Sequence, residues 1–180
     1  ARLRDAQTFA GEFLRRLPAD DLAQRTAEQW ATALVNALDF VRERRPGAPK
    51  VRVFNAEGTG VDATRTIVEI VTDDMPFLVD SVGMRIGQAG HALHTVVHPM
   101  YRVTRDPGGH LLTLAADDGT AGSAESFMRF ETDRIAGASD LEKLRQGILA
   151  TLDDVRESVT DWAQMRAKML AIADELPQRN

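Results

Sequence analysis

Three aspartates stand where a predicted strand gives way to a predicted helix. Asp73 and Asp74 follow a β-branched run, and Asp80 comes within the first turns of the helical pattern. Such a junction gathers backbone N–H groups without intrahelical partners and the positive end of the helix dipole, which suits an anionic or zwitterionic small molecule. The segment is therefore our candidate effector site. Its residues are Asp73, Asp74, Met75, Pro76, Phe77 and Asp80.

The same acids have two other interpretations. One of them could cap the helix while Pro76 opens its first turn, which requires no ligand. Alternatively, Asp73, Asp74 and Asp80 could provide the carboxylates of an independent hydrolase. Acids at a helix start are caps far more often than catalytic groups, so we expect no catalytic residue in this chain.

Histidine and glycine patterns do not indicate a metal or a cofactor. His94 and His98 are separated by about 13 Å on a predicted strand that rises ~3.3 Å per residue, too far apart for one zinc ion. Gly58-x-Gly60 imitates a dinucleotide fingerprint, but the chain continues into a strand instead of opening a helix. Cysteine is absent, which removes thiolate nucleophiles and disulfides. We expect no metal ligand and no cofactor in this chain.

Composition and charge exclude other classes of protein. A chain of 180 residues with 43% hydrophobic residues can fill a core. Its net charge of −5, with acids and bases intermixed, argues against a nucleic-acid partner. No apolar window is long enough to span a membrane, and the N-terminus lacks signal-peptide order. We expect a soluble cytoplasmic protein. Because the chain starts without Met inside a helical pattern, we also expect it to be a piece of a longer one.

The residues that carry this chemistry need an α+β scaffold. Apolar spacing over residues 4–45, interrupted by Pro18, predicts a helical hairpin. After it, strand and helix periods alternate as in a sandwich of an antiparallel sheet with helices on one face. The turn Asp106-Pro107-Gly108-Gly109 should close a hairpin. The predicted strands are 51–53, 64–72, 92–103, 110–115 and 126–135, and the predicted helix between them is 76–89.

Two further helices are predicted at the C-terminal end. Ser139 and Glu142 match a capping box before an amphipathic helix, and Thr160-Asp161 is expected to cap a last helix. The predicted division of the chain is a helical segment over 1–47, an α+β domain over 48–158 and a C-terminal helix over 159–180.

Residues 73–82 carry a resemblance to a known family. Their sequence is Asp-Asp-Met-Pro-Phe-Leu-Val-Asp-Ser-Val, and His98-Pro99 and Arg105-Asp106 follow it. With Arg44-Arg45-Pro46-Gly47 upstream and Asp161-Trp162 downstream, the chain resembles the N-terminal region of the large bacterial NAD-specific glutamate dehydrogenases. The resemblance covers nearly the whole chain.

This resemblance implies a ferredoxin-like, ACT-type module concerned with amino-acid sensing or subunit contact. The parent enzymes deaminate glutamate to 2-oxoglutarate and ammonia with NAD, through parts far downstream, so this piece is expected to lack catalytic activity. Its expected partners are other domains or subunits, a second copy in a homo-oligomer and a small amino-acid effector. Two departures stand out. Phe77 replaces the glycine that follows the proline of the usual ligand loop, and the last strand has no candidate unless 51–55 supplies an edge strand.

Overall fold

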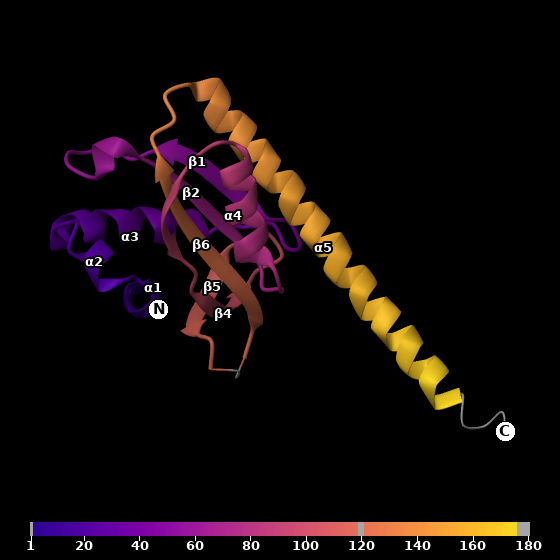
Figure 1. Ribbon diagram of the computed structural model, residues 1–180. Helices are drawn as coiled ribbons and strands as arrows, with labels where there is room; N and C mark the ends of the chain where they lie inside the picture. Colours follow the sequence, from indigo (N-terminus) through magenta and orange to yellow (C-terminus); the bar gives the residue numbers. More distant parts are fainter. Residues whose placement is uncertain (1, 119–120, 176–180) are drawn as a thin grey trace.

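Six antiparallel strands form one sheet within the described residues, 2–118 and 121–175, of this computed structural model (Figure 1). They are β1 (Lys50–Asn55), β2 (Arg65–Asp73), β3 (Leu93–Val97), β4 (Met100–Arg105), β5 (Leu111–Ala116) and β6 (Ser123–Asp133). The order across the sheet is β1-β2-β6-β4-β5, with β3 also beside β6. The last strand in the sequence therefore lies at the centre of the sheet.

β3 and β4 follow one another along the same side of β6. Val97 faces Arg129 and Met100 faces Ser126, so both strands keep one register. Pro99 lies between them and has no N–H for the ladder, but its carbonyl accepts a hydrogen bond from the backbone N–H of Phe127 at 3.0 Å. The strand predicted over 92–103 is confirmed as one line of chain that is interrupted at its proline.

β1 fills the place left open by the missing last strand. It pairs antiparallel with β2, with Val51 opposite Ile70 and Val53 opposite Val68. A strand at this edge completes the ferredoxin-like order, so residues 51–55 do supply the edge strand that the sequence analysis required. The α+β, ACT-type sandwich predicted from the sequence is confirmed.

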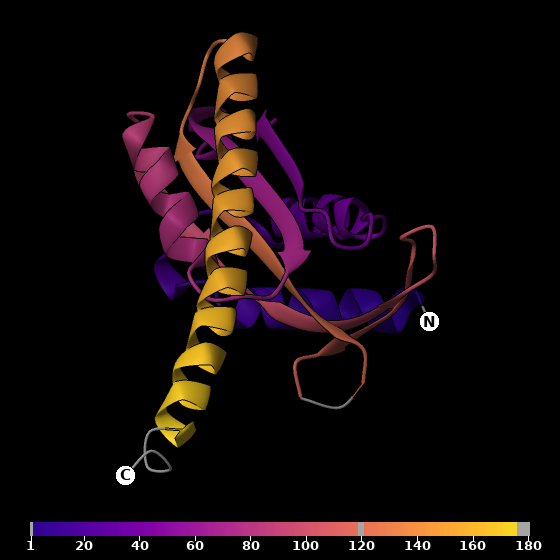
Figure 2. The same cartoon turned by 90° about the vertical axis from the view of Figure 1, so that its right-hand side faces the viewer.

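Helices α4 (Leu78–Gln88) and α5 (Ala138–Glu175) cover one face of the sheet, in front of it in Figure 2. Leu78, Val82 and Ile86 form the buried stripe of α4 that the sequence predicts. Gly90, with a φ of 85°, follows the end of that helix in the left-handed conformation. The facing side chains of the sheet and of α5 complete this core; they include Val68, Ile70, Met128, Phe130, Leu144, Ile148 and Leu152.

The N-terminal helices cover the opposite face of the sheet. They are α1 (Arg2–Arg15), the short α2 (Ala19–Leu22) and α3 (Ala27–Val41), behind the sheet in Figure 2. Phe9 stacks on Tyr101 with ring centroids 5.3 Å apart, and Phe13 lies against Trp30. The sequence predicts the helical hairpin but leaves its position open, and the sandwich it predicts has helices on one face. The structure adds this second layer.

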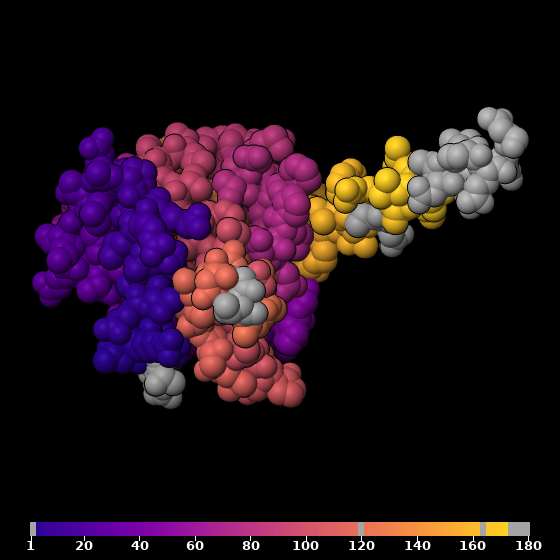
Figure 3. All heavy atoms as spheres, turned by 90° about the horizontal axis from the view of Figure 1, so that it is seen from below, coloured from indigo at the N-terminus to yellow at the C-terminus, as the bar shows by residue number. Residues whose placement is uncertain are grey.

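α5 is one continuous helix of 38 residues, which corrects two predictions. Ser139 lies inside its first turn, so the predicted capping box does not open it. Thr160 does not start a new helix, because its hydroxyl donates within the same helix to the carbonyl of Arg156 at 2.8 Å. The predicted boundary at 158/159 therefore falls inside α5. Figures 1 and 3 show the C-terminal part of α5, in yellow, projecting from the rest of the protein.

Candidate functional site

The loop between β2 and α4 brings together most of the predicted effector residues. One cavity of about 390 Å³ opens beside this loop, and His98 and Met100 from the strand line of β3 and β4 complete its wall. All but one of the predicted residues line it, namely Asp74, Met75, Pro76, Phe77 and Asp80. The predicted cluster thus exists as a cavity, with Asp73 left out.

Phe77 has an uncommon backbone conformation. Its φ is 71°, the only positive value of a non-glycine among the described residues, and it immediately precedes α4. No side chain caps α4 by a hydrogen bond, and Pro76 lies in the turn before the helix. The interpretation of Asp73 or Asp74 as the cap, with Pro76 in the first turn, is therefore wrong. Phe77 takes the left-handed shape that glycine adopts without cost, and its side chain remains 68% exposed.

Asp73 turns away from the loop and joins a buried ion cluster. Arg44 Nη2 donates to Asp73 Oδ1 at 2.5 Å and to Glu125 Oε1 at 2.7 Å. Arg105 holds the same glutamate from Nε and Nη2, at 2.8 Å and 2.7 Å. Burial alone would lower the pKa of Arg44, but its hydrogen bonds and charge contacts with the two carboxylates raise it. Asp73 thus helps to hold the segment after α3 on the sheet.

Asp74 is part of a hydrogen-bonded row with Ser126 and His98. The fully buried Ser126 donates from Oγ to Asp74 Oδ1 at 2.5 Å, and His98 Nε2 lies 3.0 Å from the same Oγ. A hydroxyl has one hydrogen, so His98 must be the donor in its contact. Burial lowers the pKa of His98, which favours its neutral form at pH 7. In this order the histidine donates to the serine instead of accepting its proton, so the row does not have the arrangement of a Ser-His-Asp catalytic triad.

Asp80 is solvent-exposed in the first turn of α4, where the helix dipole favours a negative charge. Among the three predicted aspartates, Asp74 and Asp80 share a cavity, whereas Asp73 is paired with Arg44. The paired-carboxylate mechanism considered for a hydrolase requires two carboxylates free to act as acid and base on a substrate. Asp73 and Asp74 already have partners within the fold, so this arrangement does not supply such a pair.

A second polar cluster lies on the other face of the sheet, where sequence reasoning expected no site. Glu69 on β2 is fully buried and accepts from Arg52 and Arg129, the latter at 2.7 Å from Nη1. Arg129 also donates from Nε to Glu131 Oε1 at 3.1 Å. These charges alternate with apolar residues along the strands, a pattern typical of a solvent-exposed face. These charged side chains are buried because the N-terminal helices pack over this face of the sheet.

Arg25, from the segment between α2 and α3, extends this cluster to Asp62. It donates from Nη2 to Glu131 Oε2 at 2.8 Å and from Nε to Asp62 Oδ1 at 2.7 Å. Burial alone would raise the pKa of Glu131, but the neighbouring guanidinium groups of Arg129 and Arg25 hold it below its ordinary value. Three guanidinium groups and three carboxylates thus form one connected ion network, in the order Arg52, Glu69, Arg129, Glu131, Arg25 and Asp62.

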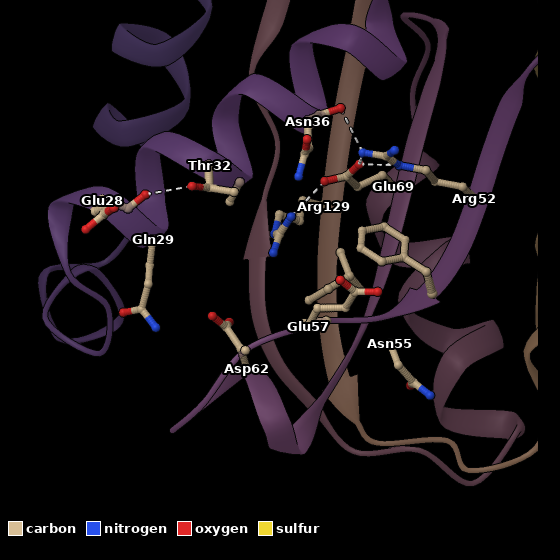
Figure 4. A pocket seen from close by; sticks show the side chains of 15 residues that line it. Glu28, Gln29, Thr32, Asn36, Arg52, Asn55, Glu57, Asp62, Glu69 and Arg129 are labelled. Atoms are coloured by element: carbon tan, nitrogen blue, oxygen red, sulfur yellow. Dashed lines mark hydrogen bonds and ion pairs between the residues drawn. The ribbon is translucent and has the colours of Figure 1, made fainter.

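A cavity of about 600 Å³ adjoins this network, between α3 and the sheet (Figure 4). One face of α3 forms a wall, and β1 with the loop after it forms the other. Ile67 and Phe54 supply apolar surface, and Arg129 and Glu69 supply charge. Figure 4 shows the guanidinium group of Arg129 pointing into the open space and the Asn55 side chain pointing away from it. The cavity combines apolar walls with a few convergent polar groups, as small-molecule sites do.

Two of the histidines contact carboxylates of the protein. His94 lies 2.7 Å from Asp133, and His110 contacts Asp106. Within residues 2–118 and 121–175, no group of three potential ligand side chains is arranged to hold a metal ion. In the same part of the chain, no helix combines the length and the apolar character required to cross a membrane.

Comparison with known proteins relates the chain to one family. Residues 9–148 match the family model of the glutamate dehydrogenase ACT1 domain. The NAD-specific glutamate dehydrogenase of Halomonas elongata is 34% identical over 176 residues, covering 96% of this chain and 11% of the relative. The enzyme of the same name from Pseudomonas aeruginosa is 35% identical over 164 residues, covering 89% of this chain and 10% of the relative. The chain thus spans about a tenth of the length of these curated relatives.

Proposed function

This chain belongs to the glutamate dehydrogenase ACT1 domain family, and from that premise we propose that it is a non-catalytic regulatory and assembly module of a longer NAD-dependent glutamate dehydrogenase. In this proposal the longer polypeptide is cytoplasmic and converts glutamate to 2-oxoglutarate and ammonia with NAD bound elsewhere. The module acts by contact with other domains or subunits.

The uncovered end of α5 is the observation that carries the assembly role. Along its first half, Leu144, Ile148, Leu152 and Val155 form a stripe that is buried against the sheet and α4. The helical spacing of apolar residues continues past the end of the sheet. There the side chains are between 56% and 68% exposed: Trp162, Met165, Met169, Leu170 and Ile172. A helix with so much apolar surface in water needs a partner to cover it.

We assign that partner to a further domain of the same longer polypeptide. About nine-tenths of the length of each relative has no counterpart in this chain. α5 also carries the chain away from the sheet as it exposes its apolar stripe (Figure 1). In this proposal a domain that follows α5 buries Trp162, and an aromatic side chain of this kind contributes a large contact area.

The test is a double substitution in the longer enzyme, Trp162→Asp with Met169→Asp. We expect it to lower the glutamate oxidation rate or the assembled mass measured by light scattering, because two charges would enter the covered surface. Val35→Asp is the matched control, since Val35 is an equally exposed apolar residue on α3. Wild-type mass and rate in the double variant would refute docking through α5.

A homo-oligomer is part of the same proposal. In the described part of the chain β1, β3 and β5 each pair with one strand only, and exposed strand edges offer unpaired backbone groups to a second copy. Light scattering of the 180-residue chain is expected to report a dimer or a larger assembly. A monomer at all concentrations would restrict assembly to contacts that need the longer polypeptide.

A second candidate function is an amino-acid effector site at the loop before α4. The specific observation in its favour is the cavity that gathers Asp74, Met75, Pro76, Phe77 and Asp80. A small amino acid bound there would be expected to raise the melting temperature in a dose-dependent way. Asp80→Trp would block that cavity, so an unchanged response in this variant would exclude the loop as the site.

A further inference from the structure

The groove between α4 and α5 lies on the side of these helices that faces away from the sheet. Figure 2 shows the two helices side by side in front of the sheet, at the surface of the described part of the chain. A cavity of about 380 Å³ lies between them. Its wall from α5 consists of Thr151, Asp154, Val155 and Ser158, and the opposite wall includes Phe77, Ser81, Met84 and Arg85.

The groove has an apolar part that is open to water. Phe77 is 68% exposed and Met84 is 63% exposed, and both line the cavity. Aromatic side chains, methionine and arginine are the residues enriched in the central part of protein–protein contacts. The lining of this groove therefore favours a protein surface as its occupant.

Arg85 supplies a cation that has no counter-charge within the described residues, 2–118 and 121–175. Its Nε is buried there without a hydrogen-bond partner. The side chain lies against α5 at Gly147, where any Cβ would overlap the Nε and Nη2 of Arg85. The glycine thus leaves the space in which the guanidinium group lies. A buried guanidinium N–H without a partner is costly, and a carboxylate from another surface would satisfy it.

Asp154 supplies an acid in the same groove. Its side chain is exposed, and its carboxylate forms no hydrogen bond or ion pair in the part of the chain that the structure describes. Gly147, which marks the position of the Arg85 guanidinium group, and Asp154 are seven residues apart on α5. They therefore lie on one face of the helix, about 10.5 Å apart along its axis. The groove carries one unpaired cation and one unpaired anion, about two helical turns apart.

These two charges select a second copy of the chain as the occupant. A partner surface of one charge sign would satisfy either Arg85 or Asp154 and repel the other. Two copies related by a two-fold axis present the same groove to one another, so that residue i contacts residue j and j contacts i. With the axis close to the partly buried Thr151, midway between the two positions on α5, Arg85 of each copy meets Asp154 of the other.

We propose that the groove between α4 and α5 is a two-fold interface between two copies of this chain. Phe77 and Met84 form its apolar part, and Arg85 with Asp154 forms an ion pair on each side of the axis. The inference rests on the homo-oligomer proposed above and names a surface for it. It uses neither the strand edges nor Trp162, so docking through α5 can fail without it.

Charge reversal in the 180-residue chain tests the ion pairs, with the dimer dissociation constant measured by sedimentation equilibrium. We expect Arg85→Glu and Asp154→Arg each to weaken the dimer at least about tenfold, because each brings like charges together at two symmetry-related points. The variant with both reversals restores opposite signs and should return to within about threefold of the wild type. Arg45→Glu and Asp20→Arg, at exposed positions outside the groove, are the matched controls and should leave the constant unchanged.

Met84→Asp tests the apolar part of the groove separately. Because Met84 is exposed, we expect this variant to remain folded by circular dichroism and to dimerise at least about tenfold more weakly. Val35→Asp, an exposed apolar residue on α3, is the control and should dimerise as the wild type does.

Three results would overturn the proposal. One is a wild-type dimer whose dissociation constant is unchanged in Arg85→Glu or in Asp154→Arg, which would place the contact on another surface and leave the proposed homo-oligomer standing. Another is a double reversal that dimerises as weakly as the single variants, which would show that the two charges do not meet. The third is a wild-type chain that stays monomeric up to about 1 mM, which would refute this interface together with a homo-oligomer formed by this chain alone.

Discussion

Arg44 and Glu125 are 81 residues apart in the sequence, and their side chains meet at 2.7 Å, each only 3% exposed. Arg44 comes just after α3, and Glu125 lies on the central strand β6. One buried ion pair thus joins the N-terminal helical layer to the middle of the sheet. A buried pair of this kind is costly to break, because removing one partner leaves the other charge uncompensated.

Arg44→Met should therefore destabilise the fold strongly. We expect a loss of about 3–5 kcal/mol in the free energy of unfolding, since Glu125 and Asp73 would lose a buried cation. Urea titration at pH 7 measures this loss. Arg45→Met, at the exposed neighbouring position, is the control and should change little. A loss below about 1 kcal/mol for Arg44→Met would show that Arg105 alone compensates Glu125.

Glu131 should make stability fall in acid. Its pKa in the fold lies below the ordinary value of 4.5, because Arg129 and Arg25 outweigh the effect of burial. The unfolded chain thus binds the proton more readily, so the stabilisation is fully present above pH 4.5 and is lost as the pH falls below it through the folded pKa. Urea titrations from pH 7 downward should show this loss in the wild type and a smaller one in Glu131→Gln. Equal pH profiles would contradict the prediction.

His98 should make the stability depend on pH in a second range, which is higher than the range set by Glu131. Burial lowers its pKa from the ordinary 6.5, so the unfolded chain takes up a proton that the folded chain resists. Stability should consequently decline as the pH falls below 6.5. His98→Gln keeps a donor for Ser126 but removes the titration, so its stability should be flatter between about pH 7 and pH 5. If the stability of this variant falls with pH as steeply as that of the wild type, another group causes the decline.

Gly109 should not tolerate a side chain. Its φ is 89°, and an added Cβ would lie 2.2 Å from the carbonyl oxygen of Arg44. Gly109→Ala must therefore displace backbone, and we expect a loss of more than about 2 kcal/mol in unfolding free energy. Gly47 has a φ of 71° with nothing within 4 Å, so Gly47→Ala should cost only the strain of the conformation. Similar losses for both variants would contradict the close contact.

Phe77→Gly should stabilise the protein. A non-glycine residue in the left-handed region costs about 1–2 kcal/mol, and the exposed ring contributes little burial in return. We expect a gain of about 1 kcal/mol by thermal or urea unfolding. Phe77→Ala keeps the strained backbone and loses the ring, so it should show no gain. If both variants lose stability equally, the ring rather than the backbone determines the effect.

Local patterns predicted the elements of the sandwich well. The apolar stripe of α4, the turn at 106–109 and the edge strand at 51–55 each follow from spacing within a few residues. Thr26 and Gln29 also form a capping box that opens α3, a signal present in the sequence but not used in the prediction. By contrast, Ser139 and Glu142 match the same pattern without forming it, because Glu142 is bound to Arg145 and Gln146 instead.

The buried ion networks could not be predicted, because their burial depends on contacts far along the chain. Glu69, Arg129 and Glu131 alternate with apolar residues, as on a strand with one wet face. What covers them is α3 and the segment around Arg25, which lies 106 residues before Glu131 in the sequence. The spacing of residues within a strand does not show whether a distant segment of the chain packs over that strand. The cavity beneath α3 was missed for the same reason.

The central position of β6 has a consequence for how the protein is made. β2, β3 and β4 all pair with β6, which is the last strand of the sheet to leave the ribosome. Until residue 133 has emerged, those earlier strands are without the neighbour that joins them, and their apolar faces are open to solvent. Synthesis at about 5–20 residues per second leaves that state exposed for several seconds. We therefore expect nascent chains cut short before β6 to depend on chaperones and to aggregate when these are absent.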